Sequence, residues 1–364
     1  MRVLSDRLFF VNRYISAVGR GQKRARDLTR DEARAAMGLV ADGRAEPLQV
    51  GAFLLALRMK GEGADELAGF VDALEERSRR AQAPAGTLDV DCHGDGHAGR
   101  ATLLPAAACA AAALGVPVLL RCELGSPTSR HGLQAALAAL GVDLARPLDA
   151  DRARASLERE RLAVLDLGAY CPPLKQLVAL RPKLGLRTVA QTLMKLVNPL
   201  GASRRLVGVF HAPYLAPTAG ALARLGVERA VCVQALGGLP EAAPGKIVRI
   251  SYSDAIEPSG IDLRAFAIPS ANDDDASANA NANANASANA SDDEEASADA
   301  SALAPVENRA ALDGREPFAT RAAAACALLL HAATGQPPLD AAHAARAALA
   351  DGRARAIATR LAGI

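Results

Sequence analysis

Apolar positions recur with a helical period over the first part of the chain. Residues 29–32 form a Thr-x-x-Glu capping box, which predicts a helix through Val40 because the threonine and glutamate side chains each satisfy a free backbone amide. Pro47 opens a second apolar helix, and Ala64 begins a third. The pattern predicts a small helical domain over residues 1–82, to which part of 167–198 can return.

From Thr87 onward, short apolar runs alternate with alanine-rich segments of helical length. The predicted strands are 87–91, 117–121, 162–166, 205–210, 229–234 and 246–250, and the predicted helices between and after them are 102–114, 129–140, 214–225, 318–333 and 339–360. Strands separated by helical connections indicate a largely parallel sheet covered on both faces. We therefore predict an α/β fold class, with the α/β domain over residues 83–270 and its C-terminal helices over 305–364.

Residues 271–304 interrupt this rhythm. Asn and Ala alternate there between two acidic clusters, and large apolar side chains are nearly absent. Such a segment buries too little to offset the entropy of ordering, so we predict a disordered acidic insertion. This insertion is either a tolerated loop expansion or a regulatory segment that competes with an anionic partner for the basic surface of the rest of the chain.

Charge is unevenly distributed along the 364 residues. The totals are 42 Lys+Arg and 40 Asp+Glu, but eight of the acids lie within 271–301. The rest of the chain therefore has 42 basic and 32 acidic side chains, a net charge of +10. Aromatic residues are scarce, with seven Phe, four Tyr and no Trp, so the core must be built from Ala, Leu and Val. The same scarcity argues against a nucleic acid held by base stacking.

Cysteine spacing and hydropathy argue against a disulfide-stabilised, zinc-binding or membrane-spanning protein. Six scattered cysteines without a C-x-x-C pair argue against a disulfide framework and a clustered zinc site. His93 and His97 are four residues apart, but in a turn, so we predict no metal and no other cofactor. The sequence shows no signal peptide and no apolar run of membrane-spanning length, so we expect a cytoplasmic protein without a membrane partner.

A stretch of 61 residues, 167–227, contains no Asp or Glu but eight cations. If 182–195 is helical, Arg187, Gln191 and Lys195 share one face, because they recur every four residues. Such a surface suits a phosphate backbone. The predicted nucleic-acid contacts, which include a second basic loop near the N-terminus, are Arg181, Lys183, Arg187, Lys195, Arg204, Arg205, Lys23 and Arg24. Alternatively, Arg181 and Arg187 belong to a substrate pocket or pair with acids elsewhere.

Several short motifs resemble glycosyltransferase family 3, the anthranilate phosphoribosyltransferase family. They lie at 114–118, 137–141, 181–188, 198–199 and 237–241. The resemblance covers nearly all of the chain outside the insertion. It implies the fold shared with nucleoside phosphorylases and a homodimer formed through the helical domain. Leu8, Phe9, Val11 and Ile15 either contribute to that interface or fill the helical domain's own core.

The residues that carry the family's chemistry are mostly replaced. The G-T-G-G-D-G diphosphate turn falls on 91–96, where Asp91, Cys92 and His93 depart from it, and the carboxylates Asp91 and Asp95 would repel an anion. The K-H-G-N-R element falls on 121–125 and keeps only the charge of Arg121. The magnesium pair Asp-Glu becomes Pro240-Glu241. The comparison implies lost transferase chemistry, so we predict no catalytic residue.

Residues 19–28 and 188–199 are similar to the YbiB-like DNA-binding branch of this superfamily. That resemblance implies a homodimer that binds DNA through phosphates, largely without sequence preference, with RNA left open. Two alternatives remain. One is a family 3 enzyme, a phosphoribosyltransferase or nucleoside phosphorylase with an altered acceptor, and the other is a scaffold whose basic face meets an acidic protein.

Overall fold

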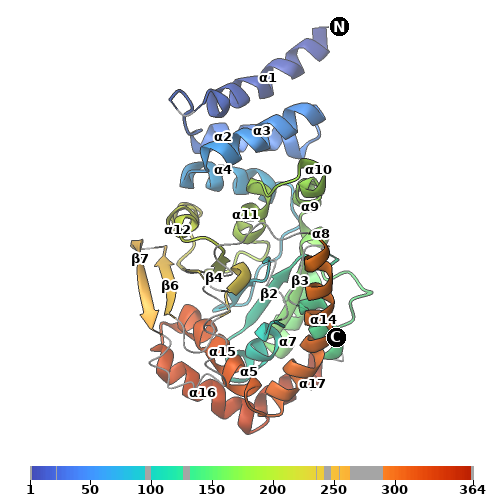
Figure 1. The fold of residues 1–364 in the computed structure, drawn as a ribbon, viewed down its shortest axis with the longest axis vertical. Coiled ribbons are helices and arrows are strands. Elements are labelled where there is room, and N and C mark those ends of the chain that lie inside the picture. Colours follow the sequence, from blue (N-terminus) through green and yellow to red (C-terminus); the bar gives the residue numbers. More distant parts are fainter. Residues whose placement is uncertain are drawn as a thin grey trace.

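The computed structural model describes residues 2–21, 23–94, 100–125, 132–234, 236–241, 247–253, 255–262 and 290–361. Its N-terminal helices are α1 (Arg2–Gly19), α2 (Arg30–Ala41), α3 (Pro47–Lys60) and α4 (Ala64–Glu75), and they stack at the top of the molecule in Figure 1. The predicted capping box is confirmed, since Thr29 and Glu32 bond to each other's backbone amides at the start of α2.

One seven-stranded sheet forms the centre of the larger domain. Its order is β3-β2-β1-β4-β5-β6-β7, and the last two strands are antiparallel to their neighbours. The bounds are β1 (Leu88–Asp91), β2 (Val118–Cys122), β3 (Leu162–Asp166), β4 (Arg204–Val209), β5 (Arg229–Gln234), β6 (Ile247–Tyr252) and β7 (Ala255–Asp262). The predicted fold class is confirmed: a small helical domain joined to a larger α/β domain with a mainly parallel sheet.

Helices cover both faces of this sheet. On one face lie α5 (Leu104–Ala113) and α15 (Phe318–Thr334), with α16 (Pro338–Ala350) and α17 (Arg353–Leu361) outside them. On the other lie α7 (Ala150–Glu160), α11 (Val189–Leu196) and α12 (Leu215–Arg224). Alanine lines α5 and α15 almost throughout, which lets them pack closely in one core with the strands. Within the described ranges, no helix is long and apolar enough to cross a bilayer.

Short helices connect the two domains. They are α8 (Leu167–Tyr170), α9 (Pro172–Val178) and α10 (Arg181–Leu184), followed by α11, which contacts α3 and α4 of the helical domain. Residues 182–195 do contain a helix, α11, but Gly185 at φ 71° ends α10 and Thr188 caps α11, so Arg187 lies before the helix and does not share its face with Gln191 and Lys195 as expected. The single helix predicted over 339–360 is likewise two, divided at Gly352 with φ 81°.

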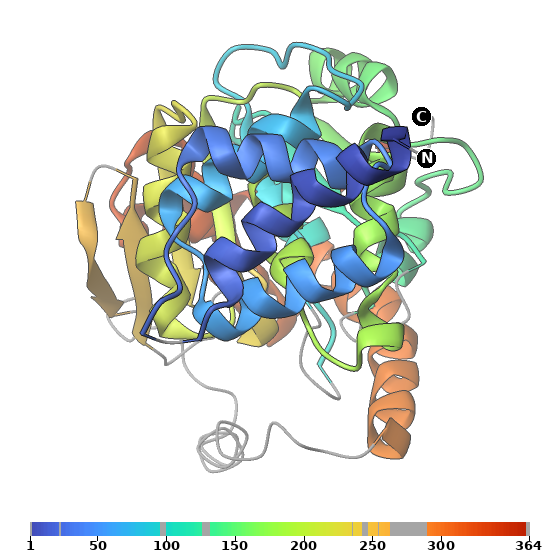
Figure 2. The same ribbon diagram turned by 90° about the horizontal axis from the view of Figure 1, so that it is seen from above.

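The disordered insertion was predicted too far toward the C-terminus. Residues 271–289 lie outside the described ranges, but α14 (Ala290–Leu312) begins inside the segment expected to lack structure. Alanine is the strongest helix former, and Ala300 and Ala304 are buried against α6 (Leu133–Ala139). Seen from above, α14 lies on the opposite side of the molecule from β6 and β7 (Figure 2). Disorder was expected because large apolar side chains are scarce in this segment, but the small side chains of Ala300 and Ala304 are buried by close helix packing.

Gly132 makes that packing possible, which gives a test of the α14 interface. The residue precedes α6 at φ 65°, and an added Cβ would lie 2.4 Å from the Ala300 carbonyl oxygen. We expect Gly132→Ala to lower the free energy of unfolding by about 2 kcal/mol more than Gly352→Ala, which shares the positive φ without a neighbour within 4 Å. Chemical denaturation measures both, and equal losses would show that α14 does not pack there.

Candidate functional site

The strand order reverses between β1 and β4, since the chain proceeds to β2 and β3 on one side and to β5 on the other. In α/β sheets such a switch point opens a crevice at the carboxyl ends of the strands. A cavity of about 800 Å³ lies at this edge. Its walls come from the segments after β1, β2, β4 and β5, from α6, and from α9 to α11; they include Cys92, His93, Glu123, Lys175, Arg181, Arg187, Gln191, Lys195 and Phe210.

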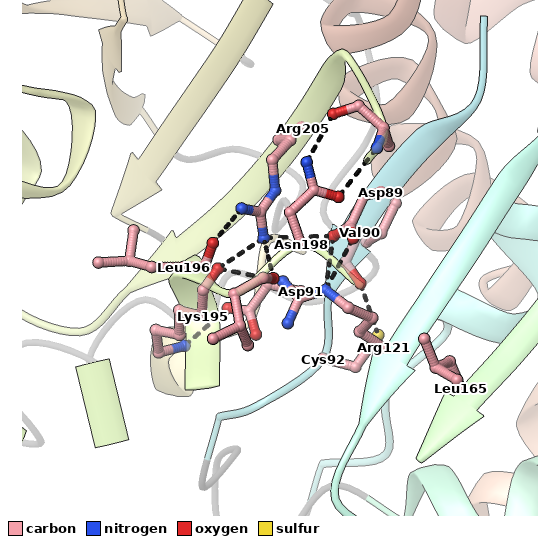
Figure 3. A network of polar contacts seen from close by, with 12 residues as sticks. Asp89, Val90, Asp91, Cys92, Arg121, Leu165, Lys195, Leu196, Asn198 and Arg205 are labelled. Carbon is pink, nitrogen blue, oxygen red and sulfur yellow. Dashed lines mark hydrogen bonds and ion pairs between the residues drawn. The ribbon is translucent and has the colours of Figure 1, made fainter. Parts of the chain in front are cut away.

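A fully buried cluster of charges lies behind this cleft, between the sheet and α11 (Figure 3). The Nε atom of Arg121 donates to both carboxylate oxygens of Asp89 at 2.8 Å. Arg205 lies on the other side of Asp89, at 3.5 Å. Strand register explains the grouping, because Asp89 on β1 pairs with Arg205 on β4, and Arg121 on β2 projects from the same face.

Both arginines also hold the carboxyl end of α11. Arg121 donates to the carbonyls of Met194 at 2.6 Å and Lys195 at 3.0 Å. Arg205 donates to the carbonyls of residues 195–197. These are the carbonyls that a helix leaves unsatisfied, at the end where its dipole favours cations. The cluster therefore fixes the last turn of α11 over the sheet, and with it the position of Lys195.

Lys195 in turn closes a second ion pair at the cleft. Its Nζ atom lies 2.8 Å from Asp91 Oδ2 and donates to the Gly238 carbonyl at 3.0 Å. The other oxygen of Asp91 is 2.7 Å from His93 Nδ1. Burial alone would raise the pKa of Asp91, but the Lys195 ammonium and the His93 hydrogen bond hold it well below its usual value. Asp91 is therefore an ionised, neutralised carboxylate.

Arg187 also lines the cleft, beside the segment that follows β4. Its guanidinium lies 5.6 Å from the centre of the Phe210 ring, a cation–π distance. Burial, and secondly the positive charge of Arg58, lower the pKa of Arg187. An arginine remains charged under such shifts. A half-buried cation facing the cavity next to a second cation is an arrangement that an anionic ligand would stabilise.

Comparison with known proteins identifies the fold and its lineage. A family model described as the helical bundle domain of the glycosyl transferase family matches residues 12–78, and one for its α/β domain matches residues 87–355. The chain belongs to glycosyl transferase family 3. The YbiB-like branch is a finer assignment that these matches do not address.

The similar proteins are enzymes of one name. Anthranilate phosphoribosyltransferase from Methylocella silvestris is 38% identical over 216 residues, or 59% of this chain and 61% of that enzyme. The enzyme from Methylobacterium sp. (strain 4-46) is 36% identical over 250 residues, or 68% and 73%. The crystal structure of anthranilate phosphoribosyltransferase from Thermus thermophilus matches with a TM-score of 0.78 and 27% identity, over 97% of this chain and 98% of that one.

Within this family 3 fold, two of the predicted nucleic-acid contacts are corrected. Arg205 is 0% exposed and bound to Asp89 and three carbonyls, so it is not a surface cation. Lys195 lines the cleft, but its side chain is only 14% exposed and its charge is paired with Asp91. The remaining cleft cations of the prediction, Arg181 and Arg187, do line the same cavity.

The other predicted contacts lie elsewhere. Arg204 begins β4 opposite Leu88, at the amino edge of the sheet and away from the cleft. Lys183 is exposed on α10, and Lys23 and Arg24 are exposed in the loop between α1 and α2. Several of the eight cations in the acid-free stretch 167–227 also form ion pairs, although that stretch itself contains no acidic residue. Four pair with acids from other segments: Lys175 with Asp166, Lys195 with Asp91, Arg205 with Asp89 and Arg224 with Asp65.

The position of the family's magnesium pair does not fit a metal site. Glu241 is buried, and its carboxylate accepts from the Thr102 hydroxyl at 2.5 Å and the Leu103 amide at 3.2 Å. Pro240 supplies no side-chain ligand. Across the described ranges, no three His, Cys, Asp or Glu residues are grouped to hold a metal ion. Glu241 instead ties the start of α5 to the segment after β5.

Sequence reasoning missed the buried charge cluster. The alternation Leu88, Asp89, Val90, Asp91 places two carboxylates on one face of a central strand, a pattern that a buried strand tolerates only with paired cations. Arg121 at the end of β2 entered the sequence analysis only as the one charge that the family's K-H-G-N-R element keeps. The alternation was the available signal that these acids and arginines would meet.

The cluster predicts a large stability loss on truncation. Arg121→Met leaves Asp89 buried with less compensation, so we expect the free energy of unfolding to fall by about 3–5 kcal/mol. The matched control is Arg154→Met, which breaks the exposed pair with Glu158 and should cost about 0.5 kcal/mol or less. Denaturant titration of both variants decides the matter, because similar losses would mean that the buried cluster is not a structural centre.

Proposed function

We propose that this chain is a pentosyl-transferring member of glycosyl transferase family 3 that binds a phosphorylated pentose in the cleft and uses an acceptor other than anthranilate. Family membership and the shared name of the relatives support the class of reaction. The changed residues after β1 and β2 support a different use of the same pocket. Cys122, Glu123 and Leu124 line the wall where the family's motif would stand.

One observation carries the proposal: Lys175, Arg181 and Arg187 line a single cavity at the switch point. A cavity of about 800 Å³ is the size of a small-molecule site. Guanidinium groups suit phosphate oxygens because their planar donors bind two oxygens at once. These three cations come from α9, α10 and the segment before α11, so a phosphate bound among them would also order the connection between the domains.

The proposed mode of phosphate binding differs from that of a diphosphate bridged by a metal ion. Glu241 is engaged with the start of α5, and the carboxylate of Asp91 stands where the family turn has glycine. We therefore propose that the ligand is held by side-chain cations and needs no magnesium. The leaving group's negative charge would be stabilised by the same cations.

A second candidate function, binding of DNA by a YbiB-like homodimer, is favoured by a separate observation. Lys183 is exposed on α10, next to the cleft residue Arg181, on a segment of 61 residues without an acid. A phosphate backbone across the mouth of the cleft would meet these cations. The exposed Lys23 and Arg24 lie in a different domain and would contribute only if the backbone extended over it.

Calorimetry with ribose 1-phosphate, which carries its phosphate on the reacting carbon C1, tests the first proposal. We expect binding that is unchanged by magnesium and weakened at least tenfold in Arg187→Met, because a charge-assisted hydrogen bond is removed. Arg154→Met, on the exposed face of α7, is the matched control and should bind as the wild type does. Absence of binding, or binding only with magnesium, would refute the proposal.

Salt titration tests the second candidate. If DNA lies on phosphate contacts, the logarithm of the binding constant should fall linearly with the logarithm of salt concentration, by about 0.9 per neutralised phosphate. The variant Lys183→Glu should weaken duplex binding and flatten that slope. Arg154→Glu removes the same amount of positive charge away from the cleft, so its effects on the affinity and on the slope should both be smaller. A shallow slope, or equal effects of the two variants, would remove this candidate.

A further inference from the structure

His93 occupies an unusual position directly after β1. Its ring Nδ1 lies 2.7 Å from Asp91 Oδ1, and its backbone N–H donates to the same oxygen at 2.9 Å. The second oxygen of Asp91 binds Lys195 at 2.8 Å. An ionised carboxylate can only accept, so the hydrogen bond assigns the proton of the neutral ring to Nδ1. The Nε2 atom is then left with a lone pair.

That lone pair has no partner in the part of the chain that the structure describes, although Nε2 is fully buried. His93 lines the cleft, with its side chain at 0% exposure. Buried polar atoms without a hydrogen bond are few in native proteins, and each calls for an explanation. A purely structural histidine would use both ring nitrogens, as His331 does with Tyr252 and the Gln336 carbonyl.

We propose that Asp91 and His93 form a proton-accepting pair, in which His93 Nε2 receives the proton of an O–H or N–H group of the molecule bound in the cleft. Only the identity of that molecule rests on the proposed function. The charged groups around the ring are Asp91 on β1, Arg121 on β2 and Lys195 on α11. Burial lowers the pKa of His93, and the two cations lower it further, against the opposing effect of Asp91.

In the transfer reaction the pair would act as follows. The acceptor's nitrogen or oxygen forms a bond to C1 of the pentose, while the C1–O bond to the phosphate breaks and the phosphate leaves with the electron pair. The acceptor's proton moves to Nε2 of His93, which becomes an imidazolium. Asp91 is a positioning residue, since it orients the ring and stabilises that cation, and Lys195 keeps Asp91 ionised.

Nitrogen NMR of the ligand-free protein tests the pair itself. The His93 signals are identified by their loss in His93→Asn. We expect a neutral ring protonated at Nδ1 at pH 7, which becomes charged only at a pH below 6.5, the ordinary value for histidine. A ring protonated at Nε2, or an imidazolium at pH 7, would overturn the inference.

Calorimetry then tests the acceptor role. His93→Asn retains a side-chain N–H for Asp91 but lacks Nε2, so ribose 1-phosphate, which offers hydroxyls beside its C1 phosphate, should bind about tenfold more weakly, while inorganic phosphate should bind unchanged. The matched control is His343→Asn, exposed on α16. Equal losses for both ligands, or no loss for the sugar phosphate, would contradict the proposal. If the wild type binds neither ligand, the proposed function is wrong and the NMR result alone decides for or against the pair.

The pH profile separates this role from a structural one. An imidazolium has no lone pair, so the wild type's affinity for ribose 1-phosphate should fall as the pH drops through the lowered pKa of His93. The affinity of His93→Asn should lack that step. A step of the same size in both proteins would assign the titration to another group and overturn the proposal.

Discussion

The buried contact of Asp89 with Arg121 and Arg205 is the constraint on which the rest of the structure depends. Removing a charge from water costs several kcal/mol per ion, and mutual attraction offsets this only when the remaining donors are satisfied. Here the two arginines satisfy most of their remaining donors at the carbonyls that end α11, and Arg205 Nε is the one donor of this pair that is buried without a hydrogen-bond partner among the described residues. Three neighbouring strands and the helix above them are therefore fixed by a single carboxylate.

The cleft inherits its geometry from this arrangement. Because the end of α11 is fixed, Lys195 lies over the end of β1 and neutralises Asp91. A carboxylate at this point of the turn was expected to repel anionic ligands. The structure shows why Asp91 does not carry that repulsion into the cleft: it is 0% exposed and bound to Lys195 and His93. The replacement of the family's glycines thus places a histidine ring, paired with a neutralised carboxylate, at the wall of the cleft.

Local pattern predicted most of the elements, but not where α14 begins, where residues 339–360 divide, or which charges meet. The capping box at Thr29 and the alternation along β1 act within a few residues, so the sequence reports them directly. Arg205 meets Asp89 across more than a hundred residues of chain, and a count of acids within 167–227 cannot register a partner outside it. The same limit applies to α14, whose alanines look uninformative until Gly132 lets them approach α6.

These pairings also decide what kind of anion the molecule suits. A polyanion needs an exposed row of cations, but two members of the predicted row, Arg205 and Lys195, are buried or nearly so and bind Asp89 and Asp91. Arg181 and Arg187 instead line one cavity at the switch point, where solvation lower than that of an open surface would strengthen their contacts with a compact anion. The loss of Arg205 and Lys195 from the accessible surface therefore favours the proposed phosphate group on a small molecule, while the exposed Lys183, Lys23 and Arg24 are the cations on which the second candidate function depends.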